Sequence, residues 1–229
     1  MDIAWDSFRL AVFDVDGTLY DQRRLRLTMA AQLGLHCARA LNLRTAHVLK
    51  RYRRRREHLA DAETVDFERV LEDELVAIHG GGGGPLRALV TDWMEVRPLP
   101  YLAAARRPGV VDLFDRLRRS GKIIGVLSDY PARDKLAALG LDADVVVSAT
   151  DAEVNVMKPH PAGLQRVMAL AGVSPDETVM IGDRAERDGE AGRRAGVRTL
   201  VLGGDTTAHW TGFTDFRQVW TAAPSAGAA

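Results

Sequence analysis

The sequence predicts an α/β protein with a Rossmann-like, three-layer core built on a parallel sheet, and an all-helical cap domain inserted into that core. Two observations support this prediction. After residue 100, short aliphatic runs alternate with helical patterns, which is typical of parallel strands joined by helices. Between 21 and 100 no such run occurs, and apolar residues recur at the three- and four-residue spacing of helices. We therefore assign residues 1–20 and 101–229 to the core and 21–100 to the cap.

The predicted elements follow in chain order. The aliphatic run 10–13 is the first strand, because a short apolar run that ends at polar residues is typical of a buried parallel strand. Within the cap, one helix face is formed by Phe67, Val70, Leu71, Leu75 and Ile78. The core then continues with a helix at 110–117 and with strands at 123–127, 145–147, 179–181 and 199–202.

Two segments are not expected to form regular structure. The glycine run 80–84, followed by Pro85, predicts a flexible loop inside the cap, because glycine is a poor helix former. The alanine-rich tail from about residue 222 is expected to be disordered.

The composition excludes several classes of protein. Lysine plus arginine and aspartate plus glutamate both number 31, so no overall charge attracts nucleic acid or an anionic membrane. Cys37 is the single cysteine, which excludes an internal disulfide and suits a reducing compartment. The N-terminus does not resemble a signal peptide, and no apolar run is long enough to span a bilayer. We expect a cytoplasmic protein with no nucleic-acid or membrane partner, and the sequence leaves its oligomeric state open.

Polar residues follow the predicted strands at their carboxyl ends. Asp14 and Asp16 come directly after the first strand. Later apolar runs are followed by Ser128, Asp129, Lys158, Asp183 and Asp188. Parallel strands present their carboxyl ends at one edge of the sheet, where open α/β sheets bind their ligands. We therefore expect these side chains to meet in one site.

The residue types in this site suit phosphoryl transfer. Asp14 can attack phosphorus as a nucleophile, while Asp16 protonates the leaving oxygen and later deprotonates the attacking water. Two like charges ~4 Å apart repel by about 4 kcal/mol at an effective dielectric constant of 20, so a carboxylate needs help to approach a phosphate. Mg²⁺ held by Asp14, the backbone carbonyl of Asp16 and Asp183 would remove this penalty. Lys158 and Ser128 would hold the phosphate oxygens.

These residues occur in four motifs that resemble those of the haloacid dehalogenase-like hydrolase superfamily. In chain order the motifs are Asp14-Val15-Asp16-Gly17-Thr18, Ser128, Lys158-Pro159 and the acidic segment 182–188. The resemblance covers 1–20 and about 101–205, and it favours the branch with a helical cap inserted after the first motif. The cap itself shows no such resemblance.

The resemblance implies a role for each matching position. Asp14 would be the nucleophile and Asp16 the acid and base, Ser128 and Lys158 would bind phosphate, and Asp183 and Asp188 would bind or support Mg²⁺ together with Asp14 and Asp16. An acid at position 16 is similar to phosphatases and phosphomutases and is unlike the dehalogenases, which makes dehalogenation a minor alternative.

Asp129 departs from the family pattern, in which asparagine or threonine often follows the serine of the second motif. By its position it is assigned, with Ser128 and Lys158, to the predicted phosphate-binding residues, and Pro131 follows two residues later. Because a second carboxylate beside a phosphate is unfavourable, we expect Asp129 to point away or to support a helix that begins at Pro131.

The cap carries a strongly basic run at 50–56. Such a run predicts a solvated helix face. The alternative is that one or two of its arginines, or Arg23, Arg24 and Arg26, recognise an anionic part of the substrate.

Together these inferences predict a magnesium-dependent phosphatase that acts on a small phosphorylated metabolite through an aspartyl-phosphate. A phosphomutase of the same fold is the alternative within the family. A different class remains open as well: an interaction protein that keeps the fold and binds RNA or an acidic partner through the arginine-rich helix.

Overall fold

Six parallel strands form one sheet in the part of the chain that the computed structural model describes, residues 5–79 and 83–220. The order across the sheet is β3-β2-β1-β4-β5-β6. The strands are β1 (Leu10–Phe13), β2 (Ile123–Ser128), β3 (Val145–Ser148), β4 (Thr178–Gly182), β5 (Arg198–Leu202) and β6 (Trp210–Phe213). The first five confirm the predicted strands. The pattern does not predict β6, because this segment contains no aliphatic run. The tail predicted to be disordered lies outside the described residues.

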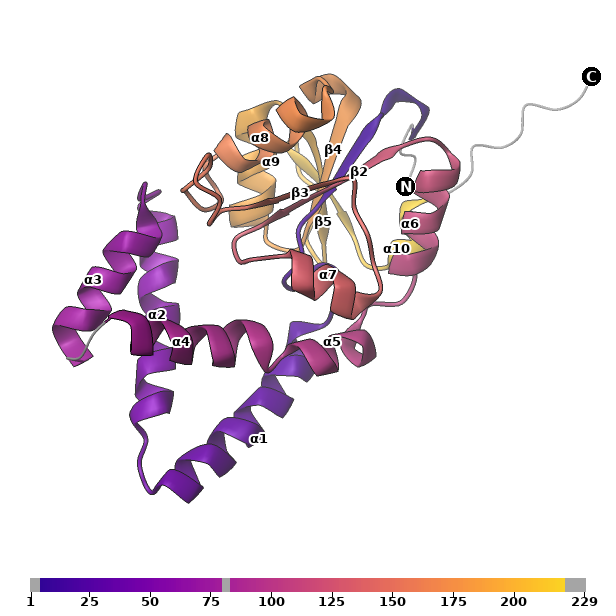
Figure 1. Cartoon of the computed structure of the whole chain (residues 1–229). Coiled ribbons are helices and arrows are strands. Elements are labelled where there is room, and N and C mark those ends of the chain that lie inside the picture. Colours follow the sequence, from indigo (N-terminus) through magenta and orange to yellow (C-terminus); the bar gives the residue numbers. More distant parts are fainter. Residues whose placement is uncertain (1–4, 80–82, 221–229) are drawn as a thin grey trace, which may run out of the picture.

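Helices cover both faces of the sheet, which confirms the predicted three-layer core (Figure 1). α8 and α9 pack on one face, and α6 and α10 pack on the other. The core helices are α6 (Val110–Arg119), α7 (Arg133–Leu139), α8 (Ala162–Ala171), α9 (Glu190–Ala195) and α10 (Phe216–Val219). Shorter helical segments are η1 (Trp5–Ser7), η3 (Pro175–Glu177) and η4 (Ala185–Gly189).

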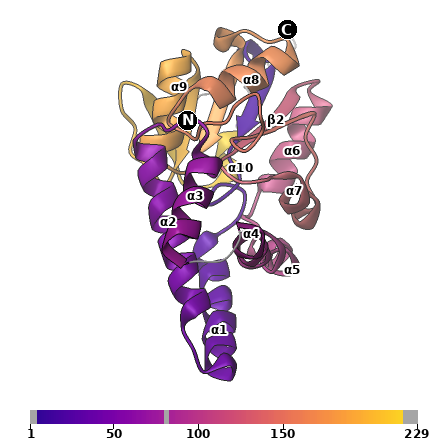
Figure 2. The same ribbon diagram turned by 60° about the vertical axis from the view of Figure 1, so that its left-hand side comes forward.

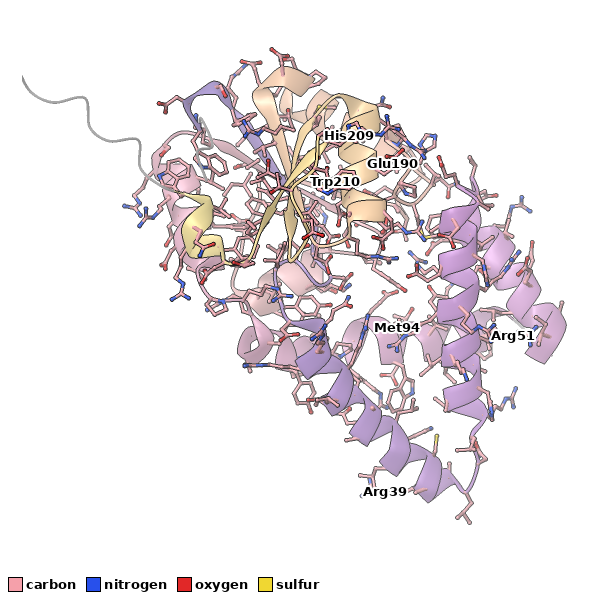
Figure 3. The ribbon with its side chains drawn as sticks, turned by 180° about the vertical axis from the view of Figure 1, so that it is seen from behind. Arg39, Arg51, Met94, Glu190, His209 and Trp210 are labelled. Carbon is pink, nitrogen blue, oxygen red and sulfur yellow. The ribbon has the colours of Figure 1, made fainter. Side chains whose placement is uncertain are left out.

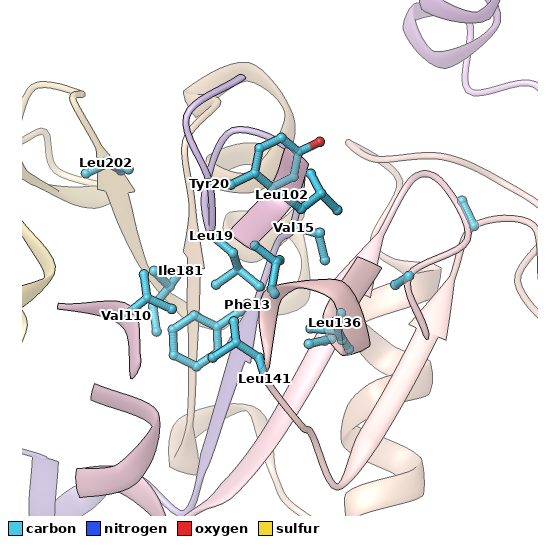
Figure 4. Packing of buried hydrophobic residues seen from close by; sticks show 14 of the residues in the cluster. Phe13, Val15, Leu19, Tyr20, Leu102, Val110, Leu136, Leu141, Ile181 and Leu202 are labelled. Atoms are coloured by element: carbon cyan, nitrogen blue, oxygen red, sulfur yellow. The ribbon is translucent and has the colours of Figure 1, made fainter. Parts of the chain in front are cut away.

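β1 is the central strand and all four of its residues are buried. Phe13 at its carboxyl end pairs with Val126 of β2 on one side and with Ile181 of β4 on the other. Side chains alternate between the two faces, so Val12 packs in the cluster beneath α8. Phe13 packs in the cluster beneath α6, where its ring centroid lies 4.7 Å from that of Phe114 (Figure 4). Burial on both faces explains why the strand is a continuous apolar run.

The described elements between β1 and α6 are all helical, as predicted for the cap. They are α1 (Gln22–Ala40), α2 (Arg44–Asp61), α3 (Phe67–His79), α4 (Gly83–Thr91), the π-helical segment η2 (Asp92–Val96) and α5 (Leu99–Ala105). α1 and α2 are two long arms that meet away from the core, and the segment from α4 to α5 closes the third side of a triangle (Figures 1 and 2). None of the described helices is long and apolar enough to cross a membrane.

The glycine run differs from the predicted loop. Gly83 and Gly84 lie in the first turn of α4, whereas 80–82 lie outside the described residues. The backbone N–H groups of a first turn need no partner within the helix, and Pro85 is tolerated there for the same reason. Burial of Leu86 and Val90 against the rest of the cap stabilises this helix, so packing outweighs the low helix propensity of glycine.

Candidate active site

The carboxyl ends of the parallel strands bring most of the predicted site residues to one edge of the sheet, beneath the cap. A cavity of about 1290 Å³ lies between this edge and the cap helices. Its core side is lined by Asp14, Asp16, Asp129, Lys158, Asp183 and Asp188. Ser128 ends β2 at the same edge but does not line the cavity. It is fully buried, and its Oγ accepts a hydrogen bond from the backbone N–H of Tyr130 at 3.2 Å.

Lys158 links two of the carboxylates on the floor of the cavity. Its Nζ lies 2.5 Å from Oδ1 of Asp14 and 2.6 Å from Oδ1 of Asp188. Thr18 donates its hydroxyl to Oδ2 of Asp14 at 2.8 Å, and Oδ2 of Asp188 accepts the backbone N–H of Asp183 at 3.1 Å. Both oxygens of Asp14 are therefore held in fixed directions.

Burial and the closeness of like charges shift the pKa values of two carboxylates in this cluster upward. Burial, with the charges of Asp188 and Asp183, raises the pKa of Asp14 above its ordinary value despite the neighbouring Lys158. Burial and the charge of Asp188 raise the pKa of Asp183 to about 6. Burial alone would lower the pKa of Lys158, but the carboxylates of Asp14 and Asp188 hold it well above its ordinary value. Lys158 is thus protonated.

The same cluster fits a divalent cation. Carboxylate oxygens of Asp14, Asp183 and Asp188 all lie within 4.8 Å of one another. With all three carboxylates ionised and Lys158 protonated, the cluster would carry two net negative charges, which one divalent cation would balance. An all-oxygen donor set is what hard cations such as Mg²⁺ prefer. The side chain of Asp16 does not belong to this cluster.

Gly17 allows the first motif to approach the fourth. Its φ of +105° lies in a region that side-chain-bearing residues rarely adopt, and a Cβ built on it would lie 2.1 Å from Oδ2 of Asp183. A glycine at this position is therefore required for the turn after β1 and for the position of Asp183.

Asp16 is held by two residues that sequence reasoning does not identify. Lys135 of α7 places its Nζ 2.7 Å and 2.6 Å from the two carboxylate oxygens of Asp16, and the hydroxyl of Tyr20 donates to Oδ1. Burial alone would raise the pKa of Asp16, but the charge and hydrogen bonds of Lys135 lower it from its ordinary value. Neither residue belongs to a motif, and Lys135 lies on a helix whose position relative to Asp16 depends on the tertiary fold.

Asp129 contacts the backbone of Lys158. Its Oδ1 accepts the N–H of Lys158 at 3.0 Å, and Arg187 donates to the carbonyl oxygen of Lys158 at 3.1 Å. The peptide groups on either side of the lysine are thus fixed from two directions. The alternative prediction, a helix beginning at Pro131 and supported by Asp129, is wrong: α7 begins at Arg133 and no side chain caps it.

The basic run in the cap is not uniformly solvated. Arg56 is only 3% exposed, because its side chain packs between α2 and the core. It donates to the carbonyl of Asp129, and its guanidinium carbon lies 4.1 Å from the ring centroid of Tyr130. The prediction of a solvated face is therefore wrong for Arg56. Lys50, Arg51, Arg53 and Arg54 are exposed as predicted, but all of these except Arg51 also line the cavity.

A second contact ties α2 to the fourth motif. Glu57 accepts hydrogen bonds from Arg184 and Arg187 at 3.2 Å. Asp61, one turn later, lies 2.5 Å from Nη2 of Arg187. The carboxyl-terminal part of α2 is thus bonded to the segments that carry Asp183 and Asp188.

Curated relatives with phosphatase names match much of the chain. Phosphoglycolate phosphatase 1 of Pseudomonas aeruginosa (strain PAO1) is 28% identical over 201 residues, which covers 85% of this chain and 69% of that protein. Pyrophosphatase PpaX of Bacillus mycoides (strain KBAB4) is 33% identical over 98 residues, 41% of this chain. That match spans less than half of the relative, 44% of its length.

Solved structures share the fold across almost the whole chain. A HAD phosphatase from Thermococcus onnurineus has a TM-score of 0.65 at 21% identity, covering 93% of this chain and 96% of that one. Haloacid dehalogenases also share the fold, and at such identities the likeness concerns the fold alone. A model of the haloacid dehalogenase-like hydrolase family matches residues 8–196, which include the four motifs and the helical cap. The chain therefore belongs to the haloacid dehalogenase-like hydrolase family.

Proposed function

We propose that this protein is a magnesium-dependent phosphatase that hydrolyses a small phosphate monoester through an aspartyl-phosphate on Asp14. The observation that carries the proposal is the cluster of Asp14, Asp183 and Asp188 around Lys158. It has the charge to hold a divalent cation, and a lysine to bind a phosphate, on the floor of a cavity closed by a helical cap.

The first half-reaction begins at Asp14. One of its carboxylate oxygens attacks phosphorus, the ester oxygen leaves, and Asp16 supplies the proton that this oxygen needs. Thr18 and Lys158 restrict the rotation of the nucleophile through their contacts with its two oxygens. Such restriction lowers the entropy cost of reaching the attacking geometry.

The second half-reaction regenerates the enzyme. Asp16, now a carboxylate, takes a proton from a water molecule that attacks the phosphorus, and inorganic phosphate leaves Asp14. Against the opposing effect of burial, Lys135 stabilises the ionised form of Asp16 and lowers its pKa, which favours Asp16 as the base of this second step.

Lys158 would hold the phosphate oxygens. Ser128 would support the phosphate-binding loop, because its Oγ at the end of β2 accepts the backbone N–H of Tyr130. Asp14, Asp183, Asp188 and the backbone carbonyl of Asp16 would hold Mg²⁺, which supplies charge stabilisation to the phosphoryl group when bound. Closure of the cap would exclude bulk water from the site, and the bonds of α2 to the core beside the second and fourth motifs support this role.

The experiment is release of inorganic phosphate from a panel of small phosphate esters, with Mg²⁺ and with chelator. We expect magnesium-dependent turnover that is lost in Asp14→Asn and kept in Asp115→Asn, an exposed carboxylate on α6 outside the cavity. Transfer of the phosphoryl group to a second sugar hydroxyl, without free phosphate, would instead identify a phosphomutase. Absence of both products for every ester, with a metal-binding protein that is folded, would contradict the proposal.

A further inference from the structure

We propose that the cap side of the cavity binds a second anionic group of the substrate, which makes the substrate class a phosphate ester with at least one further phosphate or carboxylate. The proposal rests on the phosphatase function proposed above and concerns the wall opposite the catalytic floor. In the described part of the chain, six cations of α1 and α2 line the cavity, and one of them, Arg56, is buried against the core. We define the cap wall as the other five: Arg23, Arg26, Lys50, Arg53 and Arg54.

The charge of the chain is distributed unevenly. Acidic and basic residues balance over the whole sequence, yet 22–56 contains eleven lysines and arginines and no aspartate or glutamate. This segment comprises α1 and most of α2, the two arms that enclose the cavity. A concave surface lined by one sign of charge focuses its electrostatic potential on the enclosed space.

The cap-wall cations lack carboxylate partners among the described residues. Nε of Arg53 donates to the thioether sulfur of Met94 at 3.3 Å, a weak acceptor. Arg26 donates to the neutral side-chain amide of Gln22 at 2.6 Å. By contrast, the neighbouring Arg55, which does not line the cavity, forms a two-point ion pair with Glu74. Arg55 shows that α2 can pair an arginine with a carboxylate, whereas Lys50, Arg53 and Arg54 line the cavity without such a partner in residues 5–79 and 83–220.

Their spacing concentrates the positive charge on one face. Lys50, Arg53 and Arg54 are three and four residues apart on α2 and so are neighbours on the helix surface. Like charges at this spacing repel and destabilise a helix, so the arrangement has a cost that a bound anion would offset. Figure 3 shows Arg51 on the side of α2 away from Met94, which lies between the two arms.

Among the described residues, no carboxylate that lines the cavity forms an ion pair with a cap-wall cation. Lys158 contacts Asp14 and Asp188, and Lys135 contacts Asp16. On the cap, Glu57 is bonded to Arg184. The uncompensated positive charge is therefore available to a ligand.

The volume and the lining suit a substrate that spans the cavity. Ligand pockets commonly occupy about 300–1,000 Å³, and this cavity of about 1290 Å³ holds more than a single phosphate. Apolar side chains also line the cavity, and they include Leu25, Met29, Leu49 and Met94. A carbon skeleton would lie against them, with the reacting phosphate at one end and the second anion at the other.

The test compares matched esters that differ only in the second anion. One pair is fructose 1,6-bisphosphate and fructose 6-phosphate, and the other is phosphoglycolate and 2-hydroxyethyl phosphate. We expect the wild type to prefer the more anionic member in kcat/KM by about tenfold or more, the value of one charge-assisted hydrogen bond. The pair with the stronger preference shows whether a phosphate or a carboxylate is bound, and a wild type without preference in either pair overturns the proposal.

Variants then locate the binding site. The triple substitution Lys50→Gln/Arg53→Gln/Arg54→Gln should reduce this preference at least about tenfold, whereas Arg51→Gln, an exposed arginine of the same helix outside the cavity, should keep it. An equal fall in kcat/KM for both members of a pair would contradict a second-anion site, because it would indicate a general defect.

A binding measurement separates this proposal from the catalytic one. In Asp14→Asn with Mg²⁺, calorimetry with fructose 1,6-bisphosphate should show an affinity that falls about tenfold when the triple substitution is added. Unchanged affinity overturns the second-anion site even if phosphate release is intact. Reduced affinity supports the site even if no ester is hydrolysed, an outcome that would contradict only the proposed phosphatase.

Discussion

The ammonium group of Lys135 contacts both carboxylate oxygens of Asp16, at 2.7 Å and 2.6 Å, although the two residues are 119 positions apart in the chain. Both side chains are largely buried, with 7% and 15% of their surface exposed. A cation in this position keeps Asp16 directed into the cavity and compensates its charge. The general acid and base of the proposed reaction therefore depends on a residue outside the family motifs.

Replacing Lys135 should misplace Asp16 relative to the leaving group. Because Lys135 lowers the pKa of Asp16 against the effect of burial, its removal by itself favours the protonated acid, so the expected loss comes from the lost positioning contact. We expect Lys135→Met to lower kcat for glycerol 2-phosphate by about tenfold to a hundredfold, because general acid catalysis is worth roughly 10²–10⁴-fold. The loss should be much smaller for 4-nitrophenyl phosphate, whose leaving group needs little protonation. Lys135→Arg should restore part of the activity, and Arg133→Gln, exposed on the same helix, should have no effect. Equal losses for both esters would contradict this role.

Asp129 should act through the backbone of Lys158 and not through direct contact with phosphate. Asp129→Ala removes the acceptor of the Lys158 N–H and should raise KM for phosphate esters several-fold, by roughly the 0.5–1.5 kcal/mol of one hydrogen bond. Asp129→Asn keeps an oxygen acceptor and removes the negative charge, so its KM should equal or fall below that of the wild type. Steady-state kinetics distinguish a hydrogen-bond acceptor from a residue needed for its negative charge. If the charge of Asp129 were needed, both variants would have a raised KM.

Magnesium should stabilise the protein by relieving repulsion among Asp14, Asp183 and Asp188. At a concentration one hundred times its Kd, a bound ion adds about 2.7 kcal/mol to the free energy of unfolding. For a domain of this size, each kcal/mol of added stability raises the Tm by about 2–4 °C. Thermal unfolding with Mg²⁺ and with chelator measures this shift.

Asp183→Asn should be more stable than the wild type without metal and should lose most of the stabilisation by Mg²⁺. Without metal, the variant should unfold at a higher temperature than the wild type, because one of three crowded carboxylates is gone. With Mg²⁺ it should gain little. If the wild type gains no stability from Mg²⁺, the assignment of these carboxylates as ligands is wrong.

Acid should loosen the contact between α2 and the core. Burial alone would raise the pKa of Glu57, but the hydrogen bonds and charges of Arg184 and Arg187 lower it from its ordinary value of 4.5. A carboxylate with a lowered pKa contributes stabilisation that is complete above the ordinary value and is lost as the pH falls through the lowered one. The radius of gyration from small-angle scattering should therefore increase below about pH 4.5.

Two variants check that Glu57 is responsible. Glu57→Gln should be expanded already at pH 6 and should change less on acidification. Glu72→Gln removes an ion pair with Arg87 that lies within the cap, so its response to pH should match that of the wild type. A Glu57→Gln protein with the scattering profile of the wild type at both pH values would contradict this account.

The sequence by itself determined the core of this protein and the identity of most residues in the candidate site. Strands β1 to β5 are short aliphatic runs that can be recognised locally, because a parallel strand buried on both faces must be apolar throughout. Asp14 and Asp183 follow such runs, and parallel strands necessarily bring their carboxyl ends together. Neither Lys158 nor Asp188 directly follows a strand, and it is the resemblance to the family motifs that places them in the same site, where the structure has them in contact.

Only the tertiary structure decided the partners of these residues. The pairing of Lys135 with Asp16, the burial of Arg56 and the helical state of Gly83 depend on contacts between elements far apart in the sequence. No local periodicity reports such contacts, because a lysine or arginine has the same pattern on a solvated helix face as beside a buried carboxylate. What distinguishes the two is the removal of water on docking, which is a property of the folded chain.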